Sequence, residues 1–197
     1  MLRWASDEFR MPGALFRDVV ERPAVSHPVA LRWMVRHLLG NAAGPFTVHK
    51  FHGDLHSQGI PVSKDTLHAY LAHLEDAFLI RPVSMETGSE RKRMVNPRKV
   101  YPVDPGLIPV YDRSGRANVG HALETCVLIE LERRGADVTW VRTREGHEVD
   151  FLARYPGGRQ ELVQVCANLD DAATREREFR GLVEAAREHG RADLSIV

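Results

Sequence analysis

Three polar side chains with different chemistry lie in two apolar runs near the end of the chain. Asp150 lies in HEVDFLARY, and Gln164 and Cys166 lie in QELVQVC, with a Pro-Gly-Gly turn between the two runs. Side chains alternate between the faces of a strand, so a hairpin is expected to bring the three to one face. Glu124, from an amphipathic stretch upstream, is expected to point at the same place. Carboxylates gathered in this way are suited to a hard divalent cation such as Mg²⁺.

The donor types limit the chemistry of this group. Gln164 offers a carbonyl oxygen without charge, whereas Mg²⁺ prefers charged oxygen ligands. Cys166 is a thiol with an ordinary pKa of about 8.5, so it lacks the permanent cation of a lysine. The alternation predicts Val149 and Phe151 on one face and Glu148 with Asp150 on the other, which makes Glu148 a candidate substitute ligand. We expect a packed sheet face with a hydrogen-bonded Asp150 rather than a cleaving centre.

Other potential metal ligands have the wrong spacing. His49, His52 and His56 follow one another at i, i+3 and i+7, each one residue after an apolar position, so they are expected to flank a buried helix face. Cys126 and Cys166 are the only cysteines, and neither has a CxxC neighbour. This usage indicates a reducing compartment without a disulfide framework or structural zinc.

The elements that position Asp150 follow the order αβββαβ. A helix is predicted to end at Gly135, with Leu123, Val127 and Leu131 on one face. Strands are predicted at 137–143, 147–155 and 160–166. A charged amphipathic helix at 171–189 and the start of a fourth strand at 194–197 complete the order, and the chain is expected to stop inside that strand.

The first half of the chain has a different pattern. Helices are predicted at 29–39, 47–57 and 63–78, with Thr47 and Ser63 as caps. A two-stranded ribbon with a mobile tip is predicted to follow, which is the order of a winged-helix domain. The predicted fold is α+β, with a lead or linker at 1–28, a winged-helix domain at 29–104 and a mixed-sheet domain at 105–197.

The winged-helix pattern predicts a second candidate site. The early residues of the third helix of such domains enter the major groove, and here Asp65 accompanies the basic ones. The ribbon tip has a local net charge of +3 that is suited to phosphate contacts. The alternatives are a solvated loop and a surface for a protein partner. The candidate DNA-binding residues are Lys64, His68, Arg91, Lys92, Arg93, Arg98 and Lys99.

Bulk composition sets broad limits. The 197 residues include 27 basic and 27 acidic side chains, so no global excess of positive charge indicates nucleic acid. No signal-type segment or window of about 18 apolar residues is present, so we expect a cytoplasmic protein without a membrane partner. No small-molecule substrate is evident.

The second half resembles the restriction-endonuclease-like PD-(D/E)XK fold. The resemblance implies that Glu124 and Asp150 match the helix Glu and strand Asp, while Gln164 and Cys166 replace the E and K of the next strand. These four are then vestigial catalytic positions. Mg²⁺ bound by Glu124 and Asp150 is implied only if the site is active, and otherwise no cofactor is expected.

Nearly the whole chain also resembles the C-terminal half of a family of predicted bacterial and archaeal AAA-superfamily ATPases. The similar phrases, in order, include GPFTVHKFHGDLHSQGIPVSKDTLHAYL, NPRKVYPVDPGL and GHEVDFLA. The P-loop pattern G-x-x-x-x-G-K-[ST] is absent, so nucleotide hydrolysis by this chain is not expected. The resemblance implies a non-catalytic module that binds DNA or a protein partner such as an ATPase. The alternatives are an Mg²⁺-dependent DNA nuclease with a remodelled site and a folded remnant of a split ATPase gene.

Overall fold

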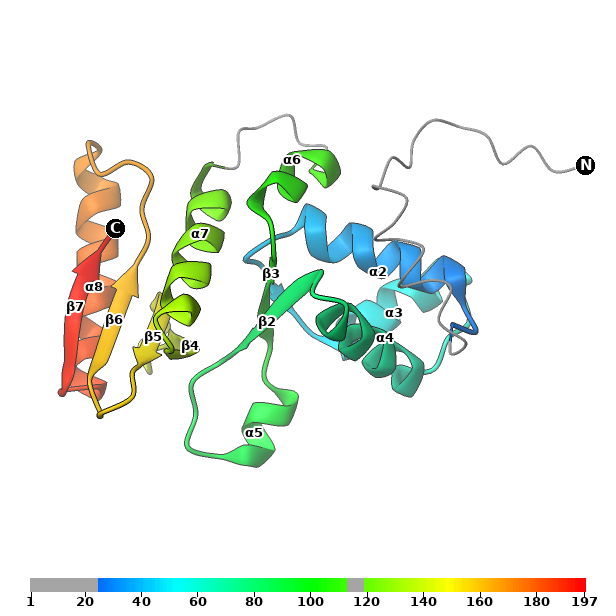
Figure 1. Cartoon of the computed structure of the whole chain (residues 1–197), viewed down its shortest axis with the longest axis horizontal. Coiled ribbons are helices and arrows are strands. Elements are labelled where there is room, and N and C mark those ends of the chain that lie inside the picture. The colour runs from blue at the N-terminus through cyan, green and yellow to red at the C-terminus, as the bar shows by residue number, and fades with distance from the viewer. Residues whose placement is uncertain (1–24, 113–118) are drawn as a thin grey trace, which may run out of the picture.

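The fold is known from a computed structural model that describes residues 25–112 and 119–197. Within these residues helices surround two β-sheets, so the predicted α+β class is confirmed (Figure 1). The helical turns predicted at 15–22 lie outside the described residues. Within the described ranges, none of the helices has the length and apolar character needed to cross a bilayer.

Three helices form the first half, as predicted: α2 (Pro28–Gly40), α3 (Val48–Ser57) and α4 (Lys64–Asp76). Both predicted caps are confirmed, since the side chain of Thr47 accepts a hydrogen bond from the Lys50 amide and that of Ser63 accepts one from the Thr66 amide. The three helices pack around a first apolar core that includes Leu31, Phe51 and Leu74.

A three-stranded antiparallel sheet closes this core. It comprises β1 (Pro45–Phe46), β2 (Ile80–Ser84) and β3 (Arg98–Pro102) in the order β1-β3-β2. The segment between β2 and β3, where the tip of the ribbon was predicted, contains a short helix, α5 (Glu90–Val95). The Ser89 side chain caps this helix by accepting from the Lys92 amide. The mobility of the tip stays a prediction. After β3 come the short helices η1 (Pro105–Leu107) and α6 (Ile108–Tyr111), which the Pro- and Gly-rich sequence did not predict.

The second half has the predicted αβββαβ order. Its elements are α7 (Val119–Arg133), β4 (Asp137–Arg142), β5 (Glu148–Arg154), β6 (Gln160–Gln164), α8 (Ala172–Glu188) and β7 (Ala192–Ile196). The sheet order is β4-β5-β6-β7, and only its β6–β7 pair is parallel. The last strand begins two residues before the predicted start at Leu194.

The two faces of this second sheet are covered by different partners. On one face α8 packs against Val149 and Leu152 to form one core. On the other face α7 and the first sheet pack together, so that Tyr101 of β3 shares a core with Phe151 and Trp140 (Figure 1). Strand β3 therefore lies between two apolar cores. The division into domains at 29–104 and 105–197 stays a prediction.

A β-bulge interrupts the pleat of β5 beside the candidate site. Val149 pairs with Val141 and Leu152 pairs with Thr139, so Asp150 and Phe151 together lie opposite the single residue Trp140. The predicted strict alternation is wrong here: Val149 and Phe151 pack into different cores. A bulge redirects side chains, and this one lies at the residue from which the candidate site is built.

Candidate functional site

Asp150 is the centre of a buried polar cluster. Its Oδ1 accepts a hydrogen bond from the Lys99 ammonium at 2.9 Å. Its Oδ2 accepts from the Gln164 side-chain amide at 2.9 Å and from the Val165 backbone amide at 3.0 Å. Only six polar or charged side chains are buried in the described part of the chain, and three of them are Lys99, Asp150 and Gln164. The expectation that Asp150 and Gln164 meet is therefore confirmed.

Lys99 reaches this cluster because of the strand on which it lies. Val100 faces the first core, so its neighbours Lys99 and Tyr101 face the second sheet. Lys99 is 6% exposed, and its prediction as a DNA-binding residue at the ribbon tip is wrong. Sequence reasoning missed Lys99 and Tyr101 as site residues, although the alternation in KVYP was a usable signal that they share a face.

The surroundings of Lys99 keep it charged. Burial lowers the pKa of an ammonium, but the nearby carboxylates of Asp150 and then Glu124 outweigh this effect, so the pKa of Lys99 is raised above its ordinary value. The ammonium also lies 5.8 Å from the centre of the Trp140 ring, within range of a cation–π interaction. Lys99 is therefore a permanent buried cation.

Glu124 extends the cluster from α7. Its Oε2 accepts a hydrogen bond from the Tyr101 hydroxyl at 3.3 Å. Burial, followed by repulsion from Asp150, raises the pKa of Glu124 to about 7, against the opposing attraction of Lys99. Burial raises the pKa of Tyr101 well above its ordinary value, so its hydroxyl remains a donor. Glu124 thus changes protonation near neutral pH.

The other two predicted positions differ from one another. The Oε1 atom of Gln164 is buried and has no hydrogen-bond partner among the described residues. Cys166 lies beyond the end of β6, where its Sγ donates to the Asn168 carbonyl oxygen at 3.1 Å. The prediction that Cys166 joins Asp150 and Gln164 is wrong, because the strand ends before the alternation reaches it. Glu148, the candidate substitute ligand, forms an ion pair with Arg142 instead.

These donors do not fit Mg²⁺ as they stand. No group of three His, Cys, Asp or Glu side chains in the described part of the chain is arranged to hold a metal ion. Asp150 Oδ1 is already bound by the Lys99 ammonium, and Oδ2 is bound by the amides of Gln164 and Val165. A divalent ion would have to lie beside this ammonium, which like-charge repulsion opposes. Among the described residues, the cation of the cluster is supplied by the protein.

The histidines of α3 do not converge on a site. His49 Nδ1 lies 2.9 Å from the Lys64 ammonium, and the rings of His52 and His56 stack with their centres 6.3 Å apart. The predicted position of these residues beside the buried helix face agrees with the burial of Val48, Phe51 and Leu55.

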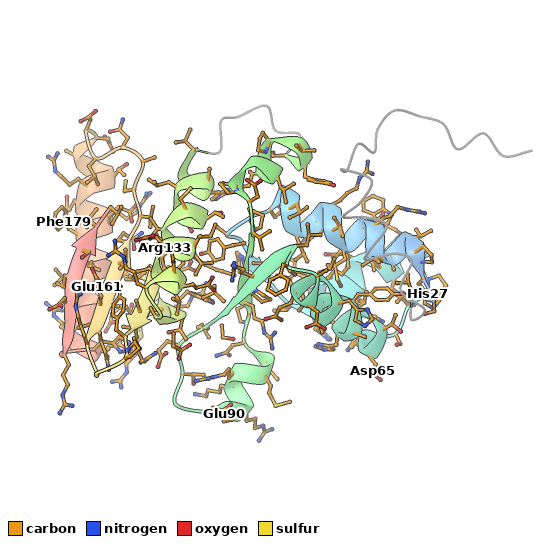
Figure 2. All side chains as sticks on the ribbon, viewed as in Figure 1. His27, Asp65, Glu90, Arg133, Glu161 and Phe179 are labelled. Atoms are coloured by element: carbon orange, nitrogen blue, oxygen red, sulfur yellow. The ribbon has the colours of Figure 1, made fainter. Side chains whose placement is uncertain are left out.

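Two of the remaining predicted DNA-binding residues line a groove of about 480 Å³. His68 from α4 and Arg98 from β3 line it, together with the apolar side chains of Met94 and Val95. Lys64 adjoins the groove through His49. Arg91, Lys92 and Arg93 are exposed on α5. This helix, whose first residue is Glu90, projects from the body of the protein (Figure 2). The structure thus brings His68 and Arg98 to one groove, with Lys64 in contact with one of its lining residues, and it places Lys99 elsewhere.

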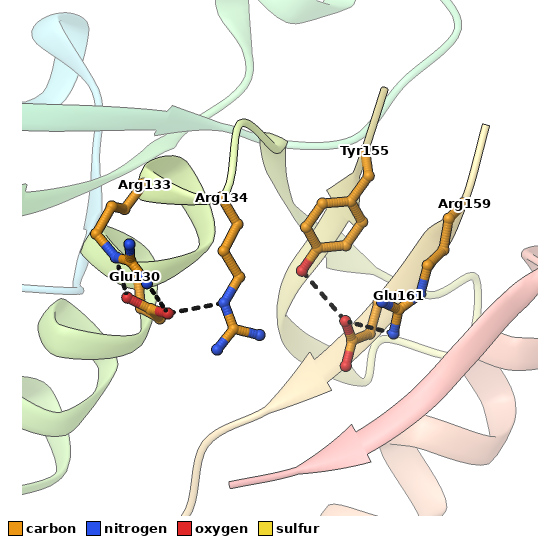
Figure 3. A network of polar contacts seen from close by, with 6 residues as sticks. All are labelled: Glu130, Arg133, Arg134, Tyr155, Arg159 and Glu161. Carbon is orange, nitrogen blue, oxygen red and sulfur yellow. Dashed lines mark hydrogen bonds and ion pairs between the residues drawn. The ribbon is translucent and has the colours of Figure 1, made fainter. Parts of the chain in front are cut away.

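A second set of ionic contacts lies on the surface of α7 and β6 (Figure 3). Glu130 accepts hydrogen bonds from Arg133 and Arg134, each at 2.7 Å, and Glu161 accepts one from the Tyr155 hydroxyl at 3.2 Å. The Arg133 side chain is 71% exposed. Exposed pairs of this kind contribute little to stability, so the set differs in kind from the buried cluster at Asp150.

Comparison with known proteins places the chain among longer relatives. An uncharacterised protein from Methanocaldococcus jannaschii is 29% identical over 182 residues, which cover 90% of this chain and 40% of that protein. An uncharacterised protein from Haemophilus influenzae is 30% identical over 140 residues, which cover 71% of this chain and 35% of that protein. The chain thus spans less than half the length of these relatives. No solved structure gives a significant match.

One family model matches more than half of the chain. It is described as a domain of unknown function, DUF8612, and it matches residues 11–114, which include the three N-terminal helices and the strand that bears Lys99. The chain therefore belongs to the DUF8612 family.

Proposed function

We propose that this chain is a non-catalytic DNA-binding module. Its first half acts as a winged helix that contacts DNA, and its second half is a nuclease-like domain whose metal chemistry has been lost. The observation that carries the non-catalytic part is the buried Lys99–Asp150 ion pair, with 2.9 Å between ammonium and carboxylate.

The ion pair supports this proposal because it is one of the contacts that occupy the carboxylate oxygens of Asp150. Asp150 accepts from Lys99, Gln164 and Val165 at once, so both carboxylate oxygens are engaged within the protein. A nuclease of the Mg²⁺-dependent kind needs that carboxylate for the ion that activates water. The absence of a lysine at position 166 adds to the argument, since Cys166 is turned toward Asn168.

The DNA-binding part is supported by the position of the basic residues. Arg91, Lys92 and Arg93 follow one another on exposed α5, between the two long strands of the first sheet. Lys64 and His68 lie on the exposed side of α4, near the groove that Arg98 lines. A helix with a basic wing beside it is suited to reading a groove while holding the phosphates.

A cleavage assay tests the non-catalytic part. The protein is incubated with plasmid and with single-stranded DNA in Mg²⁺ and in Mn²⁺, beside the Asp150→Ala variant. We expect no difference between the two proteins and no cleavage above background. Cleavage that depends on Asp150 would overturn this part of the proposal.

A salt titration tests DNA binding. We expect the affinity for a labelled duplex, measured by fluorescence anisotropy, to fall steeply as salt rises. Neutralising Arg91, Lys92 and Arg93 to Gln should reduce the slope of log K against log salt by about 2–3, since each lost phosphate contact contributes about 0.9.

A matched control removes the same charge elsewhere. Arg175, Arg177 and Arg180 are exposed on α8, and their replacement by Gln should leave the slope unchanged. If the intact protein shows no salt-dependent binding, a protein-partner role replaces DNA binding. The resemblance to ATPase C-terminal regions makes an ATPase the first partner to test.

An Mg²⁺-dependent nuclease is the second candidate function. It is favoured by two observations. Lys99 brings a cation to the same cluster as Glu124 and Asp150, and Gln164 Oε1 has no partner among the described residues. Buried groups with shifted pKa values are frequent at catalytic sites. The cleavage assay separates this function from the first, and a folded remnant is expected to fail both assays.

A further inference from the structure

Strand β7 forms a free edge of the second sheet. It is the last strand in the order β4-β5-β6-β7, and β6 is its partner. The amide of Val197, directly after β7, donates to the Gln164 carbonyl oxygen at 3.0 Å, and the Val197 carbonyl oxygen accepts from the Cys166 amide at 2.8 Å. Successive residues of a strand turn to opposite sides, so the N–H and C=O groups of Leu194 and Ile196 point away from β6. No strand among the described residues pairs with them.

This edge lacks the features that usually prevent a strand from pairing with another chain. Such features include lysine, proline, bulges and a covering segment. The sequence of β7 (Ala192–Ile196) is ADLSI, and its register with β6 is continuous. The opposite edge, β4, is covered, since Met85 bridges to Trp140 and the Glu86 amide donates to the Trp140 carbonyl oxygen. In the described structure, β7 is therefore the edge that is open to a further strand.

Three exposed apolar side chains lie beside β7. This edge strip consists of Phe179 and Val183 from α8 and Leu194 from β7, each 45–49% exposed. Leu194 is level with Leu162, which packs against α8, so Leu194 lies on the helix side of the sheet. The helix and β7 form the end of the molecule away from α2, α3 and α4, and Phe179 lies at this end (Figure 1, Figure 2).

The turn of α8 directs its two members of the edge strip toward β7. Gly181 lies on the flank of the helix that meets β5, where it packs against the Glu148 backbone. A helix turns by about 100° per residue, so Phe179 and Val183, two positions before and after Gly181, lie on the opposite flank. The same flank carries Ala186, which packs on the core that residues of β7 also join. The edge strip therefore extends outward from the open edge.

We infer that β7 pairs antiparallel with β7 of a second copy of this chain, about a two-fold axis, and that the two edge strips pack together where the strands meet. An interface of this kind has to be complementary to itself. With the axis at Ser195, the outward backbone groups of Leu194 meet those of Ile196 of the second copy, so both sets are bonded. Asp193, the charged residue of β7, then lies opposite Val197 of the second copy and not opposite another aspartate.

The charges of α8 are also complementary about this axis. The two helices run antiparallel on one face of the joined sheet, so Phe179 of one copy meets Val183 of the other. Glu176 precedes the edge strip and Arg187 follows it, and both are exposed. Antiparallel packing brings each Glu176 near Arg187 of the second copy, and these charges attract one another. This self-complementarity favours a second copy over an unrelated strand.

The inference goes beyond the proposed function, since none of the residues proposed to contact DNA lies at this edge. Sedimentation equilibrium at a series of protein concentrations tests it. We expect the wild type to dimerise reversibly and Leu194→Lys to weaken the dimer by about tenfold or more, because a charge on an edge strand opposes pairing. Val29, which is 46% exposed on α2, provides the matched control, and Val29→Lys should dimerise like the wild type. Circular dichroism checks that both variants are folded.

Cysteine cross-linking tests the register. Ser195 lies opposite itself at the axis, in a non-hydrogen-bonded pair whose Cα atoms are about 4.5 Å apart, a distance that a disulfide spans. In a background of Cys126→Ser and Cys166→Ser, we expect Ser195→Cys to give a disulfide-linked dimer on mild oxidation and Asp193→Cys to give much less.

Three outcomes overturn the inference: a wild type that stays monomeric at every soluble concentration, a dimer that Leu194→Lys leaves intact, and cross-linking without a preference for position 195. The cleavage assay and the salt titration bear on the proposed function alone, so the two can fail separately.

Discussion

At the scale of single residues, the buried pair is held by more than its two charges. The side chains of Lys99 and Asp150 are 7% and 9% exposed, so both have lost most of their hydration. Such desolvation is costly and is offset only when the remaining lone pairs are used. Asp150 meets that condition through Gln164 and Val165, and Lys99 meets it in part through the face of Trp140.

Removing one partner should therefore cost far more than removing both. We expect Lys99→Ala to lower the free energy of unfolding by about 3–5 kcal/mol, because it leaves the Asp150 charge buried. Lys99→Met/Asp150→Asn, which removes both charges at similar volume, should lose less than half as much. Urea denaturation followed by circular dichroism measures both, with exposed Lys50→Ala as a control expected within about 0.5 kcal/mol of the wild type. Equal losses in the single and double variants would contradict this account.

The raised pKa of Glu124 predicts that the free energy of unfolding depends on pH. Its pKa in the folded protein is raised to about 7 from an ordinary value near 4.5, so the folded state holds a proton that the unfolded state releases. The contribution of Glu124 to stability is therefore fully present below about pH 4.5 and is lost as pH rises through about 7. It is on the order of 1–3 kcal/mol.

The Glu124→Gln variant isolates that contribution. We expect the free energy of unfolding of the wild type to fall between pH 5 and pH 8 by more than that of the variant, measured by urea denaturation at a series of pH values. Glu130, whose side chain is 39% exposed on the same helix, provides the control. Glu130→Gln should leave the fall across this range unchanged, because Arg133 and Arg134 lower the pKa of Glu130 to about 2. A parallel pH dependence in the wild type and Glu124→Gln would refute the buried, protonated state of Glu124.

At the scale of elements, the sequence predicted most of the helices and strands for a local reason. The caps at Thr47 and Ser63 and the apolar spacing of α3 and α4 depend only on nearby residues, and all of them are present. The same holds for the αβββαβ order of the second half. Local periodicity and turn residues were sufficient wherever an element has one buried face.

Elements that deviate from simple periodicity were not predictable in this way. The bulge at Asp150 depends on pairing with β4, and it changed the faces of Val149 and Phe151. Strand β3 has cores on both sides, so Lys99 could be placed only once its tertiary neighbour was known. Half of the candidate site, Asp150 with Gln164, was thus foreseen from strand alternation, while its cation came from a distant segment.

At the scale of the whole molecule, the two sheets are joined at several points. The Glu86 amide donates to the Trp140 carbonyl oxygen at 2.7 Å, and Met85 bridges to Trp140 in a parallel manner. The Glu86 side chain also accepts from Arg154 and from Thr139 of the second sheet. Together with the Lys99–Asp150 pair, these contacts connect β2 and β3 to the sheet that carries the candidate site.

These connections predict that the two halves unfold together. Trp33 lies on α2 and is 40% exposed, whereas Trp140 is fully buried in the core that α7 shares with the two sheets. The two indoles therefore report on different halves. Two variants, Trp4→Phe/Trp33→Phe and Trp4→Phe/Trp140→Phe, each keep a single indole. For each variant we expect tryptophan fluorescence and circular dichroism to give the same urea midpoint, because β3 belongs to both cores. Arg154→Ala, which removes contacts to Glu86 and Thr139, should lower the midpoint without separating the signals. Two separate midpoints in the proteins that keep Arg154 would mean that residues 29–104 and 105–197 unfold independently. The interface that holds Lys99 would then be weaker than the shared core implies.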